Sequence, residues 1–154
     1  MAETFIRVSP EDFDPGAETE KLIRRSPEAG AVVSFVGVVR SRNDGSDVTA
    51  LTLEHYPAMT EKALRGIVER ARSRWELGDV TVIHRVGRMA VGEHIVLVIV
   101  TSAHRGEAFD ACEYIMDWLK TEAPFWKKET TPEGERWVDA RESDDHAKAR
   151  WESA

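Results

Sequence analysis

The 154-residue sequence lacks the features that mark exported, disulfide-bonded and membrane proteins. It has one cysteine, Cys112, which cannot form an internal disulfide, and it has no cysteine cluster that could hold zinc. No apolar run approaches the roughly 18 residues of a membrane-spanning helix, and residues 1–8 lack the apolar core of a signal peptide. We therefore expect a protein of the reducing cytoplasm that has no membrane partner.

An excess of positive charge is also missing. The chain has 21 lysines and arginines against 28 acidic residues, which gives a formal net charge of -7. Proteins that bind nucleic acids draw most of their affinity from a basic face, so this composition argues against a nucleic-acid partner. An anionic substrate would have to be attracted by local lysines and arginines against the overall field.

Common cofactor and metal motifs are absent as well. The sequence contains no glycine-rich phosphate loop, no Gly-x-Ser-x-Gly elbow and no dinucleotide fingerprint. The histidines at positions 55, 84 and 94 lie in predicted strands and lack the spacing of a metal-binding pair. We expect no metal and no cofactor.

The apolar residues that are present recur in patterns that predict one domain over residues 1–154, built from alternating strands and helices. Strands are predicted at residues 4–8, 31–40, 48–56, 79–87, 94–101 and 136–140, and helices at residues 17–25, 60–75 and 107–120. Ser9 and Pro10 predict a further helix start, and residues 142–154 a charged terminal helix or tail. This order is typical of the α+β class with a mixed, mostly antiparallel sheet.

Two neighbouring segments predict a long hairpin. Residues 31–40 form a nearly continuous β-branched run, which is typical of a strand buried on both faces. The polar segment 41–47 contains Asn-Asp-Gly, so residues 48–56 are expected to return as the antiparallel neighbour of 31–40.

The two longer helices have recognisable caps and apolar stripes. Pro57 is expected to break the preceding strand and Thr60 to cap the helix that follows. The helix at 107–120 has an apolar stripe of Phe109, Cys112, Ile115, Met116 and Leu119. Because Cys112 belongs to this stripe, we interpret it as a core residue and not as a reactive thiol.

Residues 117–129 interleave Lys120, Lys127 and Lys128 with two tryptophans, a phenylalanine and a proline. Pro124 disfavours helix, so Lys120 is expected near a helix end and the other two lysines on the chain beyond it. Crowded ammonium groups beside aromatic walls repel one another and lose water, which lowers a lysine pKa toward the range of nucleophilic or acid–base chemistry. On an ordinary surface, by contrast, lysine stems lie along aromatic faces and their charged heads stay in water.

Cations also follow both of the most apolar strands. Arg40 ends the first, and His104 and Arg105 follow the second at the start of a helix, where free amide hydrogens favour an anion. Either arginine could instead pair with an acidic residue. Lys120 ends the same helix, about 22 Å from its start at 1.5 Å per residue. One small molecule can touch both ends only if the chain folds back or a second subunit contributes.

Five segments together resemble the large, catalytic subunit of molybdopterin synthase. They are FVGVVR at residues 35–40, LEHYPAM at 53–59, VIHRVG at 82–87, TSAHR at 101–105 and LKTEAPFWKKE at 119–129. The resemblance runs in order from Gly30 to Arg141, while residues 1–29 match weakly.

The resemblance implies a fold, a reaction and an assembly. The fold would be an α/β hammerhead with an added antiparallel sheet. The enzyme would transfer sulfur from the C-terminal Gly-Gly thiocarboxylate of a small ubiquitin-like subunit to cyclic pyranopterin monophosphate, forming the dithiolene of molybdopterin. The assembly would be a heterotetramer, with a central dimer of large subunits and one small subunit at each end.

The same resemblance implies roles for individual residues. Lys120 and Lys127 would be the catalytic lysines, and Arg141 would reach into the neighbouring subunit's site. The remaining substrate-binding residues would be Val38, Val39, Arg40, His104, Arg105, Lys128 and Glu129. Val38 stands where some members carry lysine, which leaves a backbone contact at that position.

Two other functions fit the lysine and aromatic residues. A non-catalytic module could dock a ubiquitin-like tail as a carboxylate trap, with no need for His104 or Arg105. A lysine Schiff-base enzyme could act on a phosphorylated carbonyl compound, and borohydride would trap its adduct. The number of matching segments favours the synthase.

Overall fold

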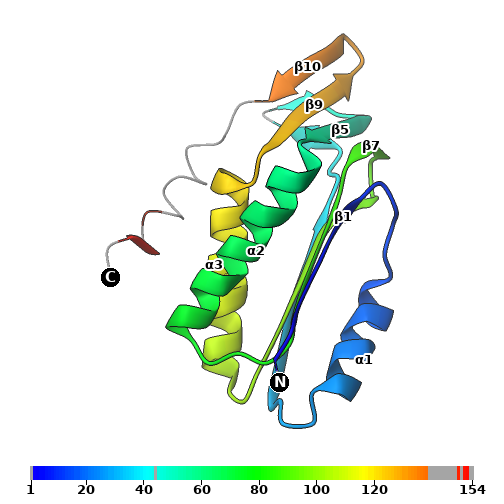
Figure 1. Ribbon diagram of the computed structural model, residues 1–154. Coiled ribbons are helices and arrows are strands. Elements are labelled where there is room, and N and C mark those ends of the chain that lie inside the picture. Colours follow the sequence, from blue (N-terminus) through cyan, green and yellow to red (C-terminus); the bar gives the residue numbers. More distant parts are fainter. Residues whose placement is uncertain (1, 44, 139–148, 150, 153–154) are drawn as a thin grey trace.

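The computed structural model describes residues 2–43, 45–138, 149 and 151–152. Its first sheet is mixed and mostly antiparallel, with the order β1 (Thr4–Ser9), β6 (Val80–Arg85), β8 (His94–Ser102) and β2 (Ala31–Val38). β1 runs parallel to β6, and β8 pairs antiparallel with both β6 and β2. Helices α2 (Pro57–Arg74) and α3 (Arg105–Glu122) cover one face, and α1 (Pro15–Arg25) covers the other (Figure 1).

A second sheet stands at one end of this layered body (Figure 1). It is antiparallel throughout, in the order β10 (Gly134–Val138), β9 (Phe125–Thr131), β5 (Ala50–His55) and β7 (Gly87–Ala90). A short hairpin of β3 (Arg42–Asn43) and β4 (Ser46–Asp47) lies between β2 and β5 in the chain. The α+β class and the added antiparallel sheet are therefore confirmed.

The alternation of side chains along β8 divides the core in two. Val96, Val98 and Val100 pack toward α2 and α3, whereas Leu97 and Ile99 pack toward α1. The two long helices bring apolar residues at three- and four-residue spacing to the first of these clusters: Leu64, Ile67, Val68, Ala71, Ala111, Cys112, Ile115, Met116 and Leu119.

The interpretation of Cys112 as a core residue is confirmed. Its thiol is free and buried, and that burial raises its pKa to about 12. Phe109 was assigned to the same stripe and is 60% exposed, so that assignment is wrong. Among the described residues, no helix is both long and apolar enough to cross a membrane.

Two predicted helix starts are wrong. Ser9 ends β1, and its hydroxyl accepts from the amide of Glu11 without starting a helix. The separate helix predicted at residues 17–25 is confirmed as α1, which begins at Pro15, where the Asp14 carboxylate accepts from the Ala17 amide at 3.1 Å. A proline at the first helical position also begins α2, so Pro57 starts that helix and does not merely end a strand. Thr60 is buried inside its first turn and is not its cap.

The predicted hairpin of residues 31–40 and 48–56 is also wrong. β2 pairs with β8, and β5 lies in the other sheet between β7 and β9. Polar turn residues signal a reversal of the chain but do not specify which strand becomes the neighbour. β2 is moreover an edge strand, with Phe35 and Val38 40% and 47% exposed, so it is not buried on both faces.

The C-terminal prediction is tested only in part. The predicted helix or tail at 142–154 lies outside the described residues, except for residues 149, 151 and 152. Trp151 packs edge-on against Trp75 and Tyr114, and its indole nitrogen donates to Asp117 at 2.6 Å. This contact ties the end of the described chain to α2 and α3.

Candidate active site

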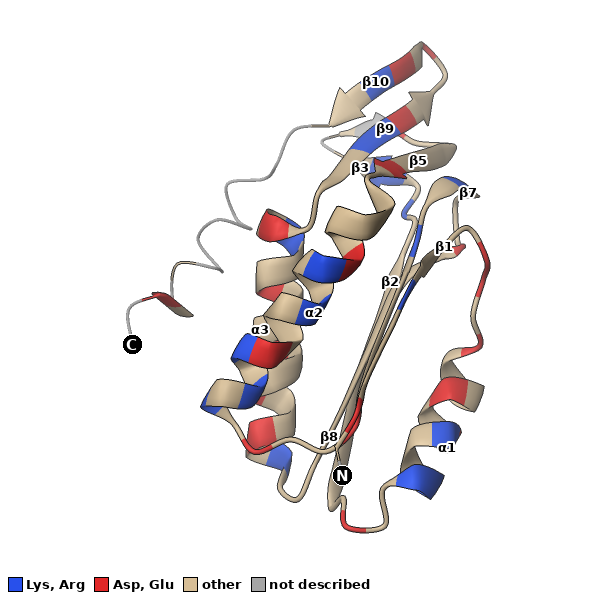
Figure 2. Ribbon diagram, in the orientation of Figure 1, with Lys and Arg blue, Asp and Glu red and all other residues tan. Residues whose placement is uncertain are grey.

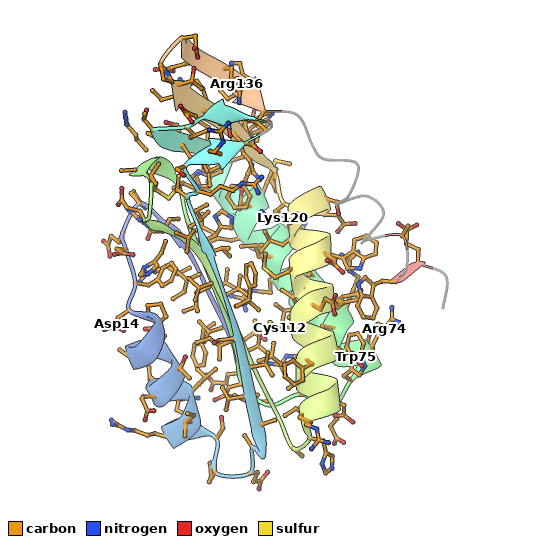
Figure 3. All side chains as sticks on the ribbon, turned by 180° about the vertical axis from the view of Figure 1, so that it is seen from behind. Asp14, Arg74, Trp75, Cys112, Lys120 and Arg136 are labelled. Carbon is orange, nitrogen blue, oxygen red and sulfur yellow. The ribbon has the colours of Figure 1, made fainter. Side chains whose placement is uncertain are left out.

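The lysine-rich segment 117–129 links the end of α3 to the second sheet. α3 closes at Glu122, where the Ala123 amide donates to the carbonyl of Leu119 at 3.3 Å. The chain then continues as β9, so Lys120 lies in the last helical turn and Lys127 on a strand. Figure 3 shows Lys120 at the end of α3 that faces the second sheet.

A cavity of about 330 Å³ lies where these elements meet. Its walls are mainly apolar, and they come from β2, β5, β8, the end of α3 and the start of β9. The lining also includes three side chains that carry nitrogen: Lys120, Lys127 and His84. The structure therefore brings the two lysines expected to be catalytic to one cavity, from two different elements.

Lys128 has a different environment, because successive side chains of a strand point to opposite faces. Its ammonium pairs with Glu135 at 3.0 Å and lies 5.4 Å from the centre of the Trp137 ring. These are the contacts of a surface lysine beside an aromatic residue. Lys128 therefore fits the second interpretation of the lysine-rich segment, in which the stem lies along an aromatic face and the charged head stays in water. Its predicted contact with substrate is not tested.

Arg40, two residues after the cavity-lining Val38, belongs to a chain of hydrogen bonds. Its Nη2 donates to the Asn43 side-chain oxygen at 2.9 Å, and the Asn43 amide nitrogen donates to Glu129 at 2.6 Å. Arg136 donates to the other oxygen of Glu129 from Nε at 3.0 Å and from Nη2 at 2.9 Å. Glu129 is only 5% exposed and helps to hold Arg40 through Asn43. Its own contact with substrate stays a prediction.

The two valines before Arg40 differ in their positions. Val38 is 47% exposed and lines the cavity. Val39 is 3% exposed and packs with Leu51, Leu53 and Met89. Its amide and carbonyl are both used in backbone hydrogen bonds, with Glu93 and Gly92. Val38 is thus open to the cavity, whereas Val39 supports the second sheet. The predicted contacts of both valines with substrate are not tested.

His104 and Arg105 lie at the opposite end of α3 from Lys120, as the sequence predicted. His104 is the N-cap residue and Arg105 begins the 18-residue helix, which is about 27 Å long. Both side chains are exposed. One chain therefore does not bring them to the cavity that Lys120 lines. Arg141, which was expected to reach into the neighbouring subunit's site, lies outside the described residues.

His84 is the site residue that sequence reasoning undervalued. It lies on β6, is 5% exposed, and its ring stacks on Phe125 with the centroids 3.9 Å apart. Burial, reinforced by the nearby ammonium groups of Lys120 and Lys127, lowers its pKa to about 3, although its hydrogen bond to Arg85 acts the other way. The signal for it in the sequence was its place in the VIHRVG segment.

Figure 2 shows acidic and basic residues interspersed along α2 and α3. Within the described residues, no group of three or more histidine, cysteine and acidic side chains is placed to hold a metal ion.

Comparison with known proteins gives consistent matches. Residues 8–122 match the family model described as MoaE protein. The molybdopterin synthase catalytic subunit of Escherichia coli strain K12 is 62% identical over 151 residues, which cover 98% of this chain and 100% of that protein. The solved molybdopterin biosynthesis MoaE protein from Burkholderia ambifaria is 54% identical, with a TM-score of 0.83 over 100% of both chains. The crystal structure of molybdopterin synthase from Staphylococcus aureus contains a chain 31% identical, with a TM-score of 0.79 over 86% of this chain and 96% of that one.

Proposed function

The chain belongs to the MoaE protein family, and we propose that it acts as the catalytic subunit of molybdopterin synthase with Lys120 and Lys127 as its reacting lysines. It takes sulfur from the C-terminal thiocarboxylate of a small ubiquitin-like subunit and transfers it to cyclic pyranopterin monophosphate, forming the dithiolene of molybdopterin. The observation that carries the residue assignment is that the lining of one cavity includes both lysines.

The cavity suits an extended, partly apolar tail that ends in a negative charge. Its walls include Val38, Leu53 and Phe125, and its cations are Lys120 and Lys127. Preorganised positive charge in a site with little water stabilises the charge that develops as sulfur leaves the acyl carbon, and it neutralises the carboxylate that remains. The same lysines are placed for the alternative roles of acyl acceptor or proton carrier.

The substrate's phosphate and ring are assigned to Arg40, His104 and Arg105. Arg40 follows two residues after Val38, which lines the cavity, whereas the other two lie at the far end of α3. A complete site therefore needs a second large subunit, whose His104 and Arg105 approach the first subunit's cavity. This requirement agrees with a central dimer in a heterotetramer, to which Arg141 would also contribute.

The location of the protein is part of the same proposal. We place it in the cytoplasm, as the single, buried Cys112 suggests.

The reaction can be tested by reconstitution. The purified chain is mixed with a thiocarboxylated small subunit and cyclic pyranopterin monophosphate, and the dithiolene product is measured. Lys120→Ala and Lys127→Ala should each abolish product while leaving folding and small-subunit binding intact, because neither side chain belongs to the buried core. Lys62→Ala, which removes an exposed lysine from α2, is the matched control.

Three results would contradict the proposal. Normal turnover by Lys120→Ala would remove that residue from the reaction. Tail binding without any product from the wild-type chain would favour a docking module. A borohydride-trapped adduct between Lys120 and the substrate would favour a Schiff-base enzyme.

A further inference from the structure

The position of His84 follows from the alternation of side chains on β6. Val80 and Val82 pack in the cluster beneath α2 and α3, and Ile83 packs in the cluster beneath α1. His84 therefore continues the row of Val80 and Val82, on the face that α3 covers. This row ends at the cavity, where His84 and Lys120 are both part of the lining.

The hydrogen bond of His84 defines its tautomer. Nδ1 lies 2.8 Å from the backbone oxygen of Arg85. A carbonyl oxygen can only accept, so Nδ1 must carry the hydrogen and donate it. In the neutral ring this leaves the lone pair on Nε2, which is the nitrogen available to accept a hydrogen bond.

The ring is held firmly in this orientation. Phe125 stacks on it with the centroids 3.9 Å apart and the planes 20° apart. Phe125 lies between the two lysines in the chain and also lines the cavity. Because burial and the neighbouring ammonium groups lower the pKa of His84 to about 3, the ring stays neutral at physiological pH. It is therefore suited to accept a hydrogen bond and not to remove a proton from an ammonium group.

We propose that His84 is a positioning residue for Lys120: its Nε2 accepts a hydrogen bond from the Lys120 ammonium when the donor tail fills the cavity. Lys120 ends a helix and its side chain is exposed, so it has many rotamers. A fixed acceptor selects the rotamer that points the positive charge into the cavity. This inference rests on the proposed function of Lys120.

Two substitutions distinguish the role of Nδ1 in His84 from the role of Nε2. In His84→Asn the side-chain amide reaches only the Nδ1 position, so it keeps the bond to the Arg85 carbonyl but loses the acceptor. In His84→Gln the longer side chain places its amide oxygen near the Nε2 position. We expect His84→Asn to lower kcat roughly 10- to 100-fold with little change in KM, as for the loss of a hydrogen bond to a charged group, and His84→Gln to restore most of the activity.

His55→Asn is the matched control. His55 stacks on the same Phe125 ring, with the centroids 6.4 Å apart, and it is not among the described residues that line the cavity. Its substitution should leave kcat within about twofold of the wild type, because it tests the loss of an imidazole beside Phe125 without the loss of the acceptor.

A spectroscopic measurement keeps the inference testable if a variant fails to fold. Nitrogen-15 spectra of the histidine rings in the wild-type complex with the thiocarboxylated subunit should show His84 as the neutral Nδ1–H tautomer. The Nε2 signal should shift in Lys120→Met and not in Lys62→Met. An Nε2–H tautomer, or an Nε2 signal that is the same with and without Lys120, would overturn the inference.

The activity assay distinguishes the two proposals. If the wild-type chain forms dithiolene and His84→Asn does so at the same kcat, the role of His84 is refuted and the function stands. If the wild-type chain forms no dithiolene, the function itself is refuted.

Discussion

Substitution of Glu129 by glutamine should weaken both the fold and the anion site. The carboxylate is 5% exposed and accepts hydrogen bonds from Asn43 at 2.6 Å and from Arg136 at 2.9 and 3.0 Å. Glutamine has one acceptor oxygen. If that oxygen stays with Arg136, the new amide group faces the amide group of Asn43, and two donors meet.

The loss of unfolding free energy in Glu129→Gln can be worked out from the two interactions that the substitution weakens. A hydrogen bond to a charged group contributes about 1.5–3 kcal/mol, and the Asn43 bond to Glu129 is of this kind. The ion pair with Arg136 adds at most about 1 kcal/mol, because Arg136 is 41% exposed and water screens the pair. Together these losses lower the free energy of unfolding by about 2–4 kcal/mol, or Tm by roughly 5–15 °C for a chain of this size.

Urea unfolding of Glu129→Gln measures this loss. Glu135→Gln is the control, because Glu135 is 55% exposed and pairs only at the surface, with Lys128 at 3.0 Å. Its unfolding free energy should change by less than about 1 kcal/mol. Equal unfolding midpoints for the two variants would refute the reasoning.

The same substitution should reach the substrate through Arg40. In the wild-type protein the Asn43 side-chain oxygen accepts from Arg40 Nη2 at 2.9 Å. In Glu129→Gln, Asn43 can keep a hydrogen bond with the new amide group only by rotating its own amide, and this rotation turns the Asn43 oxygen away from Arg40. The affinity for cyclic pyranopterin monophosphate, measured by calorimetry below the melting range of the variant, should therefore fall with Glu129→Gln and not with Glu135→Gln.

Four further measurements test the site and the core. Arg40→Ala and Arg105→Ala should weaken binding of the pterin about tenfold or more, since each removes a charged donor, and unchanged affinity in both would exclude a phosphate site there. At a pterin concentration too low to occupy the Arg105→Ala site, neither Lys120→Ala nor Arg105→Ala subunits should turn over alone. Mixing them should then recover about one quarter of wild-type activity, because half the dimers would contain one intact composite site, whereas no recovery would place both residues in a site made by one subunit. Cys112 should resist thiol reagents at pH 8 in the folded protein and react in urea, because burial raises its pKa to about 12, and rapid labelling of the native protein would contradict that burial. The folded pKa of His84, about 3, lies below its unfolded value of about 6.5, so the unfolded chain takes up the extra proton first as the pH falls. The stability that His84 contributes is therefore present above pH 6.5 and is lost toward pH 3, at up to about 1.4 kcal/mol per pH unit. The free energy of unfolding should fall less steeply with pH in His84→Gln than in the wild type, and equal slopes for the two proteins would contradict this.

The sequence by itself determined the properties that depend on neighbours in the chain. The apolar periodicity of α2, β8 and α3 placed these elements to within a few residues, because the pattern of a helix or strand is local. Pro124 likewise indicated that Lys120 ends a helix and that Lys127 lies beyond it. The rise of a straight helix was enough to separate Arg105 from Lys120.

Only the tertiary structure decided which of these parts meet. Asn43 and Glu129 are 86 positions apart, and their bond depends on β5 joining β9 and not β2. Because side chains alternate along β9, Lys127 and Lys128 must face opposite sides of the strand. Which of the two faces the cavity depends on how the second sheet packs against α3, and in the structure it is Lys127. His84 gained its place beside Lys120 in the same way. Local patterns specify the elements, whereas the choice of partners depends on the burial of surfaces contributed by distant parts of the chain.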